Sequence, residues 1–425
     1  EARTRLEAIT RAAELADESG RAETAFELAQ EQRSLATELG DRRTSISADV
    51  RIAMMRYFRG NGPGALADLN RILADLHDDE LEARGVVLGN MGIVLKNAAR
   101  YDEAIESTAQ AERINRKRGA SDLVCSNMLT RANMLKHMRE YEACLELLSE
   151  LKDFAALLGR SRLVAMAIGT AANVQSRMGK EEEAVNLYLE AAKLFADVED
   201  ERNYIITRSN LAVARYFAGE TDLAAAELSE SADAAVGSGL RGCAMASLCA
   251  LADLQLDRRD YESAHATVLR LEELESLGAT PHDRIQNSLV KSRLLLAQDK
   301  PNDAVTVLRG VMKSVPAADL DEDFAAAQSM LARASFESGN PVEAIELASL
   351  SFDLAERVFP PDVECMLHSG LTWARSAQLL GDGEEVARLV LDMKDLQQRL
   401  EPTGISSKKL HSEVTDFLAN AAGTP

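Results

Sequence analysis

Aromatic residues are scarce in this sequence and make up only 4% of its 425 residues. Alanine is abundant instead, and hydrophobic residues reach 46%, which is enough for an ordinary folded core. Small side chains in place of aromatic ones favour close packing of helices over a sheet sandwich. No segment shows the alternation of apolar and polar residues that is typical of a strand. The composition therefore predicts an all-α protein.

Cysteine is also rare, and the sequence lacks the features of a disulfide framework. The number of cysteines is odd, and no two of them are spaced as Cys-x-x-Cys. In a chain of this length we expect buried, reduced thiols, which fit a cytoplasmic protein. The five are Cys125, Cys144, Cys243, Cys249 and Cys365.

Long apolar runs and an excess of positive charge are both missing. No run approaches the ~20 apolar residues that a membrane span needs. Because the first residue is Glu1 and not Met, the lack of a signal peptide excludes nothing. The 48 basic and 69 acidic residues give a net charge of −21, which repels phosphate backbones and anionic lipids. We therefore expect a protein or peptide partner, and neither nucleic acid nor a membrane.

What the sequence does contain is an internal repeat. Stretches similar to YDEAI return with a period of 40 through the middle of the chain, and at steps of 39 and 42 nearer its ends. We call the residue that aligns with the alanine of YDEAI, Ala104, the anchor of each stretch, and a second small residue lies 12 positions before each anchor. The ten anchors are Ala25, Ala65, Ala104, Cys144, Ala184, Ala224, Ala264, Ala304, Ala344 and Val386. The second small residues are Ala13, Ala53, Gly92, Ala132, Ala172, Ala212, Ala252, Ser292, Ala332 and Ala374.

Each copy is interpreted as two antiparallel helices, with the first small residue on helix A and the anchor on helix B. Gly92 illustrates the packing, because glycine inside a helix costs roughly 1 kcal/mol relative to alanine. We predict that the two helices approach too closely at Gly92 for a larger side chain. The breaks between helices A and B contain glycines suited to the left-handed position that closes a helix. Examples are Met178–Glu181, Ala218–Thr221 and Ser338–Pro341.

The repeat predicts one solenoid, because a single helix pair cannot bury its apolar face and neighbouring pairs must stack. We expect about ten repeats across residues 1–400 and a C-terminal capping helix across residues 405–422. Leu410, Val414 and Phe417 have helical spacing in this last segment and give the helix an apolar face.

The paired helices resemble tetratricopeptide repeats (TPR), in which L-G-x-x-Y is followed by A-x-x-x-F. The period of 40 departs from the usual 34 and resembles the longer repeats of kinesin light chains, LGN-type adaptors, and bacterial MalT-like and Rap-like regulators. The resemblance implies a right-handed α-solenoid. The matching residues are Met91-Gly92 and Leu211-Ala212 for the L-G pair, Tyr101, Tyr141 and Tyr261 for an aromatic before the alanine, and Ala184-x-x-x-Tyr188 for A-x-x-x-F.

Helix A residues that face the hollow of such a superhelix lie 18, 14, 11 and 7 positions before the anchor, and several are unusual for a helix. Asparagine is a poor helix residue, but its amide has donors and acceptors that can hold a peptide backbone. The families resembled here use asparagines on this surface to grip extended peptides. The alternative is that these residues are merely solvated. The candidate groove residues are Asn90, Asn97, Asn133, His137, Asn173, Arg177 and Asn210.

A second pattern places arginine 11 positions before the anchor in the last three copies, at Arg293, Arg333 and Arg375. Three guanidinium groups at one structural position predict an anion-binding ladder for carboxylates or phosphates, and thus a partner with an acidic segment. The alternative is pairing within the chain, because Asp253 has the same position one copy earlier and Glu337 lies one turn beyond Arg333.

No nucleophile–base pair or carboxylate dyad stands out, so we expect neither an enzyme nor a cofactor. The run His77–Glu80 includes a histidine but lies at a turn between repeats without further ligands, so we expect no metal. We expect a peptide-binding TPR scaffold, the regulatory region of a larger bacterial signalling protein, that grips an extended segment in its concave groove. The alternative is a MalT-like sensor that changes curvature or self-association when it binds a metabolite.

Overall fold

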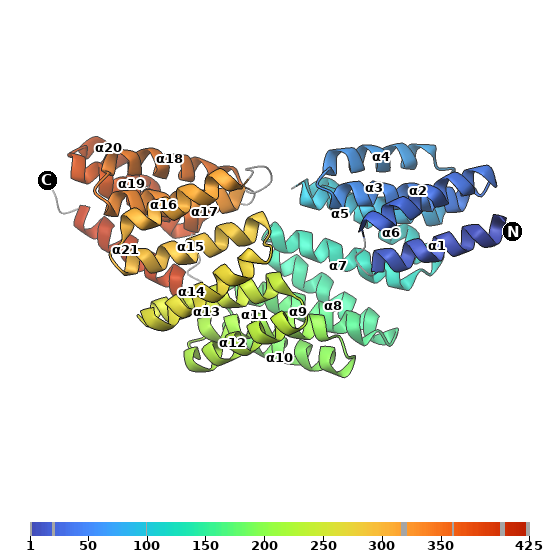
Figure 1. Cartoon of the computed structure of the whole chain (residues 1–425), viewed down its shortest axis with the longest axis horizontal. Coiled ribbons are helices and arrows are strands. Elements are labelled where there is room, and N and C mark those ends of the chain that lie inside the picture. The colour runs from blue at the N-terminus through green and yellow to red at the C-terminus, as the bar shows by residue number, and fades with distance from the viewer. Residues whose placement is uncertain are drawn as a thin grey trace. The chain divides into compact units, whose positions relative to one another are not determined.

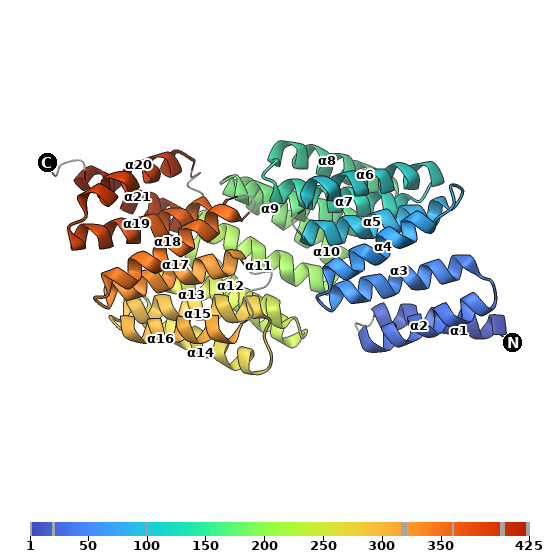
Figure 2. The same cartoon turned by 90° about the horizontal axis from the view of Figure 1, so that it is seen from above.

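The computed structural model describes residues 2–18, 22–98, 100–315, 321–358, 361–399 and 404–421. In these ranges the chain forms 21 α-helices and no strand. Consecutive helices pack against each other, and within each unit a helix runs antiparallel to the one before it (Figures 1 and 2). The all-α prediction is confirmed. None of the described helices is long and apolar enough to cross a membrane.

The chain divides into two compact units, Glu1–Gly159 and Arg160–Pro425. The single solenoid across residues 1–400 therefore stays a prediction. The helices of the first unit are α1 (Ala2–Glu18), α2 (Ala22–Glu38), α3 (Arg42–Phe58), α4 (Gly62–Asp75), α5 (Leu81–Asn97), α6 (Tyr101–Arg118), α7 (Ser121–His137) and α8 (Tyr141–Leu157). Those of the second unit are α9 (Ser161–Arg177), α10 (Glu181–Asp197), α11 (Glu201–Phe217), α12 (Thr221–Gly237), α13 (Arg241–Asp257), α14 (Tyr261–Ser276), α15 (Pro281–Ala297), α16 (Pro301–Ser314), α17 (Asp321–Glu337), α18 (Pro341–Arg357), α19 (Val363–Leu380), α20 (Gly383–Arg399) and α21 (Gly404–Ala421).

The small residues of the repeat lie where the helices of a pair touch. Odd-numbered helices from α1 to α19 correspond to helix A and even-numbered helices from α2 to α20 to helix B. All ten helix A small residues are buried, and so are the helix B anchors except for the partly buried Val386. A Cβ atom added to Gly92 would overlap the Thr108 side chain of α6, which confirms the prediction for this glycine.

The predicted breaks between helices A and B coincide with observed helix ends. Helix α9 ends at Arg177 and α10 begins at Glu181, and the other two breaks match in the same way. Gly179, Gly219 and Gly339 have φ angles of 71°, 90° and 85°, the left-handed conformation expected after a helix. At three equivalent turns a residue with a side chain takes this conformation, and Glu199 does so at the turn between α10 and α11, which joins one pair to the next. The three residues at equivalent turns are Arg139, Arg259 and Asp299, and all four φ angles lie between 55° and 61°.

Replacing Arg259 with glycine should stabilise the fold. The left-handed conformation costs a residue with a Cβ atom about 1–2 kcal/mol. Glycine removes most of this strain from the folded state, although it also increases the conformational entropy of the unfolded chain. We expect Arg259→Gly to raise the free energy of unfolding by about 0.5–1 kcal/mol, measured by urea denaturation. The matched reverse change, Gly219→Ala, should lower it. A destabilised Arg259→Gly variant would contradict the assigned turn geometry.

The last helix, α21, packs against α19 and α20 through an apolar face. Leu410, Val414, Phe417 and Leu418 are all buried in the cluster they share with α19 and α20. The predicted helix across residues 405–422 corresponds to α21, apart from residue 422, which lies outside the described residues. The capping role of this helix stays a prediction.

Candidate functional site

Four of the predicted groove residues lie in the first unit, and their side chains already have partners there. The Asn90 amide donates to the carbonyl of Val86, one turn earlier on α5, at 3.0 Å. The Asn133 amide on α7 donates to the carbonyl of Leu129, one turn earlier, at 3.1 Å, and its oxygen accepts from the Lys136 ammonium at 3.1 Å. These amides are therefore partly engaged by their own helices.

The other two first-unit residues contact tyrosines. Asn97 donates to the hydroxyl of Tyr57 on α3, the helix A of the preceding pair. The His137 ring stacks on Tyr101 of α6, with ring centroids 6.2 Å apart and planes 12° from parallel. Both contacts join neighbouring elements of the array, so these side chains contribute to its structure.

The three predicted groove residues of the second unit are less engaged. Asn173 on α9 accepts a hydrogen bond from the Tyr188 hydroxyl at 2.7 Å through its oxygen, which leaves its NH₂ group unused. Burial raises the pKa of Tyr188, so this hydroxyl stays protonated and keeps donating. Within the described ranges, neither Asn210 on α11 nor Arg177 at the end of α9 forms a side-chain hydrogen bond or ion pair. Because α9 and α11 contact each other, these donors and acceptors lie on adjacent A helices.

Each arginine of the predicted ladder has a carboxylate partner. Arg293 on α15 pairs with Asp253 and, at 3.6 Å, with Asp257, both on α13. Arg333 on α17 pairs through Nε with Glu337 at 2.9 Å. Arg375 and Glu413 approach to 4.0 Å. This geometry agrees with the alternative of pairing within the chain, most clearly for Arg293, which lies between two aspartates. The anion-binding ladder itself stays a prediction.

A pocket of about 380 Å³ opens among the A helices α13, α15, α17 and α19, with α21 as a further wall. Its lining includes Arg293 and Arg333 but not Arg375. The sequence analysis did not identify three other lining residues, Glu364, His368 and Lys409. One signal was present for His368, which lies 18 positions before the anchor Val386 and thus at a hollow-facing position. No repeat pattern covers Lys409, because it belongs to α21.

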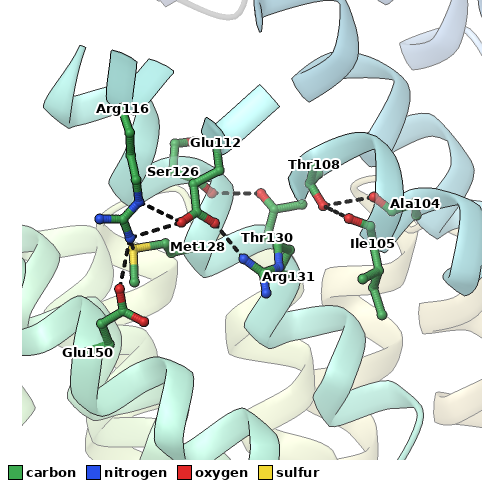
Figure 3. A network of polar contacts seen from close by, with 10 residues as sticks. All are labelled: Ala104, Ile105, Thr108, Glu112, Arg116, Ser126, Met128, Thr130, Arg131 and Glu150. Atoms are coloured by element: carbon green, nitrogen blue, oxygen red, sulfur yellow. Dashed lines mark hydrogen bonds and ion pairs between the residues drawn. The ribbon is translucent and has the colours of Figure 1, made fainter. Parts of the chain in front are cut away.

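A buried carboxylate joins three helices of the first unit (Figure 3). Glu112 on α6 accepts from Arg116 at 2.9 Å and from Arg131 on α7 at 2.5 Å. Arg116 also donates a hydrogen bond to the carboxylate of Glu150 on α8 at 2.8 Å. Only 10% of the Glu112 side chain is exposed. Every member has a protein partner, so the network is structural.

Thiols and possible metal ligands are further chemical groups of interest in the described part of the chain. All five cysteines lie there, and none forms a disulfide. Burial raises the pKa of Cys144 and Cys365 to about 11 and that of Cys249 to about 12, so these thiols are protonated at neutral pH. Among the described residues no group of three or more His, Cys, Asp or Glu side chains could hold a metal ion.

No protein-family model and no curated protein sequence matches the chain. Solved structures do resemble it. A Rap protein in complex with competence and sporulation factor aligns with a TM-score of 0.54 and 13% identity, covering 97% of this chain and 99% of that one. The apo form of RapI gives a TM-score of 0.58 and 11% identity, with coverages of 83% and 98%.

The apo form of the quorum sensor NprR from B. thuringiensis gives a TM-score of 0.50 at 12% identity, with coverages of 83% and 98%. Identities this low indicate a shared fold and nothing about the ligand. The likeness extends over most of the chain and agrees with the repeated pairs of A and B helices. The chain therefore shares the helical-repeat fold of these solved structures.

Proposed function

We propose that this chain is a non-enzymatic scaffold that binds an extended peptide or protein segment and regulates a larger bacterial signalling protein in the cytoplasm. The observation that carries the proposal is the set of polar groups on α9 and α11 that have no hydrogen-bond or ion-pair partner among the described residues. These are the NH₂ group of Asn173, the whole amide of Asn210 and the guanidinium of Arg177.

An extended peptide offers a backbone N–H and C=O at every residue. A primary amide is complementary to both, because it has two donor hydrogens and an acceptor oxygen. Asn173 and Asn210 each lower the intrinsic helix propensity of their helices. Binding of a backbone gives a reason for asparagine at these positions. A Rap protein of similar fold forms a complex with competence and sporulation factor, which adds support.

The alternative is a sensor of a small ligand, and the pocket in the second unit favours it. Its volume of about 380 Å³ lies within the range of small-molecule sites. A sensor should gain thermal stability from a metabolite mixture, because a ligand that binds only the native state stabilises it. A scaffold should instead enrich defined sequences from a random peptide library.

The scaffold proposal predicts which asparagines matter. Peptides enriched from a random library on the wild-type chain should bind the Asn173→Ala/Asn210→Ala variant more weakly. Each lost hydrogen bond contributes about 0.5–1.5 kcal/mol, so the dissociation constant should rise roughly tenfold. Fluorescence polarisation with labelled peptides measures the change.

Asn90→Ala is the matched control, because the Asn90 amide is already bonded to its own helix. It should change peptide affinity by less than about twofold. Equal losses in Asn90→Ala and in the double variant, with both still folded, would assign the effect to something other than backbone recognition on α9 and α11.

A further inference from the structure

The pocket of the second unit presents cationic groups from separate helices. Arg333 on α17 donates a hydrogen bond from Nε to the Glu337 carboxylate. Its two Nη groups have no partner among the described residues. Lys409 on α21 is exposed and likewise has none in the described ranges. His368 on α19 lines the same pocket, half-buried, and its ring forms no hydrogen bond that the described residues account for.

The carboxyl groups of the pocket are mostly engaged by other groups. Asp253 and Asp257 flank Arg293, and Glu413 faces Arg375. The Asp362 carboxylate caps α19 by accepting from the Cys365 N–H at 3.0 Å.

Glu364 is the exception, because its carboxyl forms no hydrogen bond within the described part of the chain. Burial and the neighbouring Asp362 both raise the pKa of Glu364, which favours its neutral form. Lys409 is therefore a cation without a carboxylate partner among the described residues, and Arg333 keeps two Nη groups available beside its ion pair with Glu337.

We propose that this pocket binds an anion through a carboxylate or phosphate group held between Arg333 and Lys409, with His368 as a third donor. A guanidinium with both Nη groups available can hold two oxygens, and an ammonium adds a point charge from another direction. The site is independent of the proposed peptide groove, because it uses none of the residues on α9 and α11. It also differs from the arginine ladder, because it excludes Arg375 and adds residues of α19 and α21.

His368 makes this site sensitive to pH. Burial, together with the charges of Arg333, Arg293 and Lys409, lowers the pKa of His368 to about 4, so the empty pocket holds a neutral imidazole. A bound anion would offset those three cations and raise this pKa. The complex would then take up a proton more readily than the free protein, so affinity should rise as the pH falls. The helices α18 and α20, which also pack on α19, contribute no described residue to the pocket lining.

The test is isothermal titration calorimetry of the full chain with three probes at matched ionic strength: sulfate, citrate and a tetraglutamate peptide. The test variants are Arg333→Gln and Lys409→Gln, whose side chains are exposed, so we expect both to fold. The controls are Arg309→Gln and Arg270→Gln, because Arg309 pairs with Glu343 and Arg270 with Asp233 on B helices outside the pocket. Melting temperatures confirm that each variant is folded.

We expect at least one probe to bind to the wild type. Each test variant should lower the affinity for that probe about tenfold, while the controls should change it by less than about twofold. Preference for sulfate or citrate identifies a small-molecule anion, and preference for tetraglutamate identifies an acidic peptide segment. Absence of saturable binding for all three probes, or equal losses in the controls, overturns the proposal.

Sulfate also tests the role of His368, because the charge of sulfate is constant between pH 5.5 and 7.5. The affinity of the wild type for sulfate should be higher at pH 5.5 than at pH 7.5. This increase should be smaller in His368→Gln. An equal rise in both proteins would remove His368 from the site. Asn173→Ala/Asn210→Ala should bind the same anion normally, so failure of the peptide groove and failure of this site can be told apart.

Discussion

Replacing Glu112 with glutamine should lower the free energy of unfolding by about 2–4 kcal/mol. The carboxylate is 10% exposed and accepts from Arg116 and Arg131, which are 41% and 26% exposed (Figure 3). Its neutralisation leaves two guanidinium groups without the charge that compensates their desolvation. The expected loss is below that of a fully buried pair because solvent reaches Arg116. Urea denaturation followed by circular dichroism measures it.

Glu150→Gln is the matched control for Glu112→Gln. Glu150 also accepts from Arg116, but 58% of its side chain is exposed, so its loss should change stability by less than about 1 kcal/mol. Adding Arg131→Met to Glu112→Gln should recover part of the stability, because the unpaired charge is then removed. If Glu112→Gln is no more harmful than Glu150→Gln, the network does not stabilise α6 against α7.

Gly92→Ala is expected to destabilise the first unit by roughly 1–3 kcal/mol, although alanine is the better helix former. The added Cβ would overlap Cγ2 of Thr108 and lie 3.3 Å from the carbonyl oxygen of Ala104. Thr108 cannot easily turn away, because its hydroxyl donates to that carbonyl at 2.8 Å and also contacts the Ile105 carbonyl at 3.1 Å. The denaturation midpoint reports the change.

Two variants separate this overlap from a general effect of alanine. Thr108→Ser keeps the hydroxyl and removes the methyl group, so it should rescue Gly92→Ala. Gly310 lies inside α16 with no heavy atom within 4 Å of an added Cβ, so Gly310→Ala should stabilise by about 0.5–1 kcal/mol. Additive behaviour of Gly92→Ala and Thr108→Ser would show that the two residues are not in close contact.

The fold could be predicted because its determinants recur with a regular period along the chain. A small residue twelve positions before each anchor marks where two helices touch, and Gly179 and Gly219 mark where one helix ends. Packing at native density admits little variation at such positions. The left-handed conformations of Arg259 and Asp299 follow the same repeat, although their residue types give no sign of it.

The division of the chain after Gly159 has no counterpart in the sequence pattern. The step from the anchor Cys144 to the anchor Ala184 is the same as the steps before and after it, so the repeat is the same in both units. Composition likewise shows no break there. A repeat pattern reports the unit that recurs and carries little information about how far stacking remains uniform.

The candidate site was less predictable, because side-chain partners are set by rotamers and by neighbouring repeats. The pattern placed Asn90 and Asn210 at the same position, yet the first bonds its own helix and the second does not. Arg293 and Arg333 also share a position, but only Arg293 lies between two aspartates. Lys409 comes from the helix that follows the repeats, where no periodicity indicates its neighbours.

If amides on α9 and α11 hold the backbone of a bound peptide, N-methyl scanning of a library-selected peptide should detect those bonds one at a time. Each synthetic peptide carries one N-methylated amide, which removes a donor and retains the side chains. We predict that one position loses affinity roughly tenfold, because the Asn210 oxygen can accept from a peptide N–H, whereas the Asn173 oxygen already accepts from Tyr188. This loss should shrink in the Asn173→Ala/Asn210→Ala variant because the acceptor is already gone. Unchanged affinity at every methylated position, or losses of the same size in the wild type and the variant, would rule out backbone recognition by the Asn210 amide.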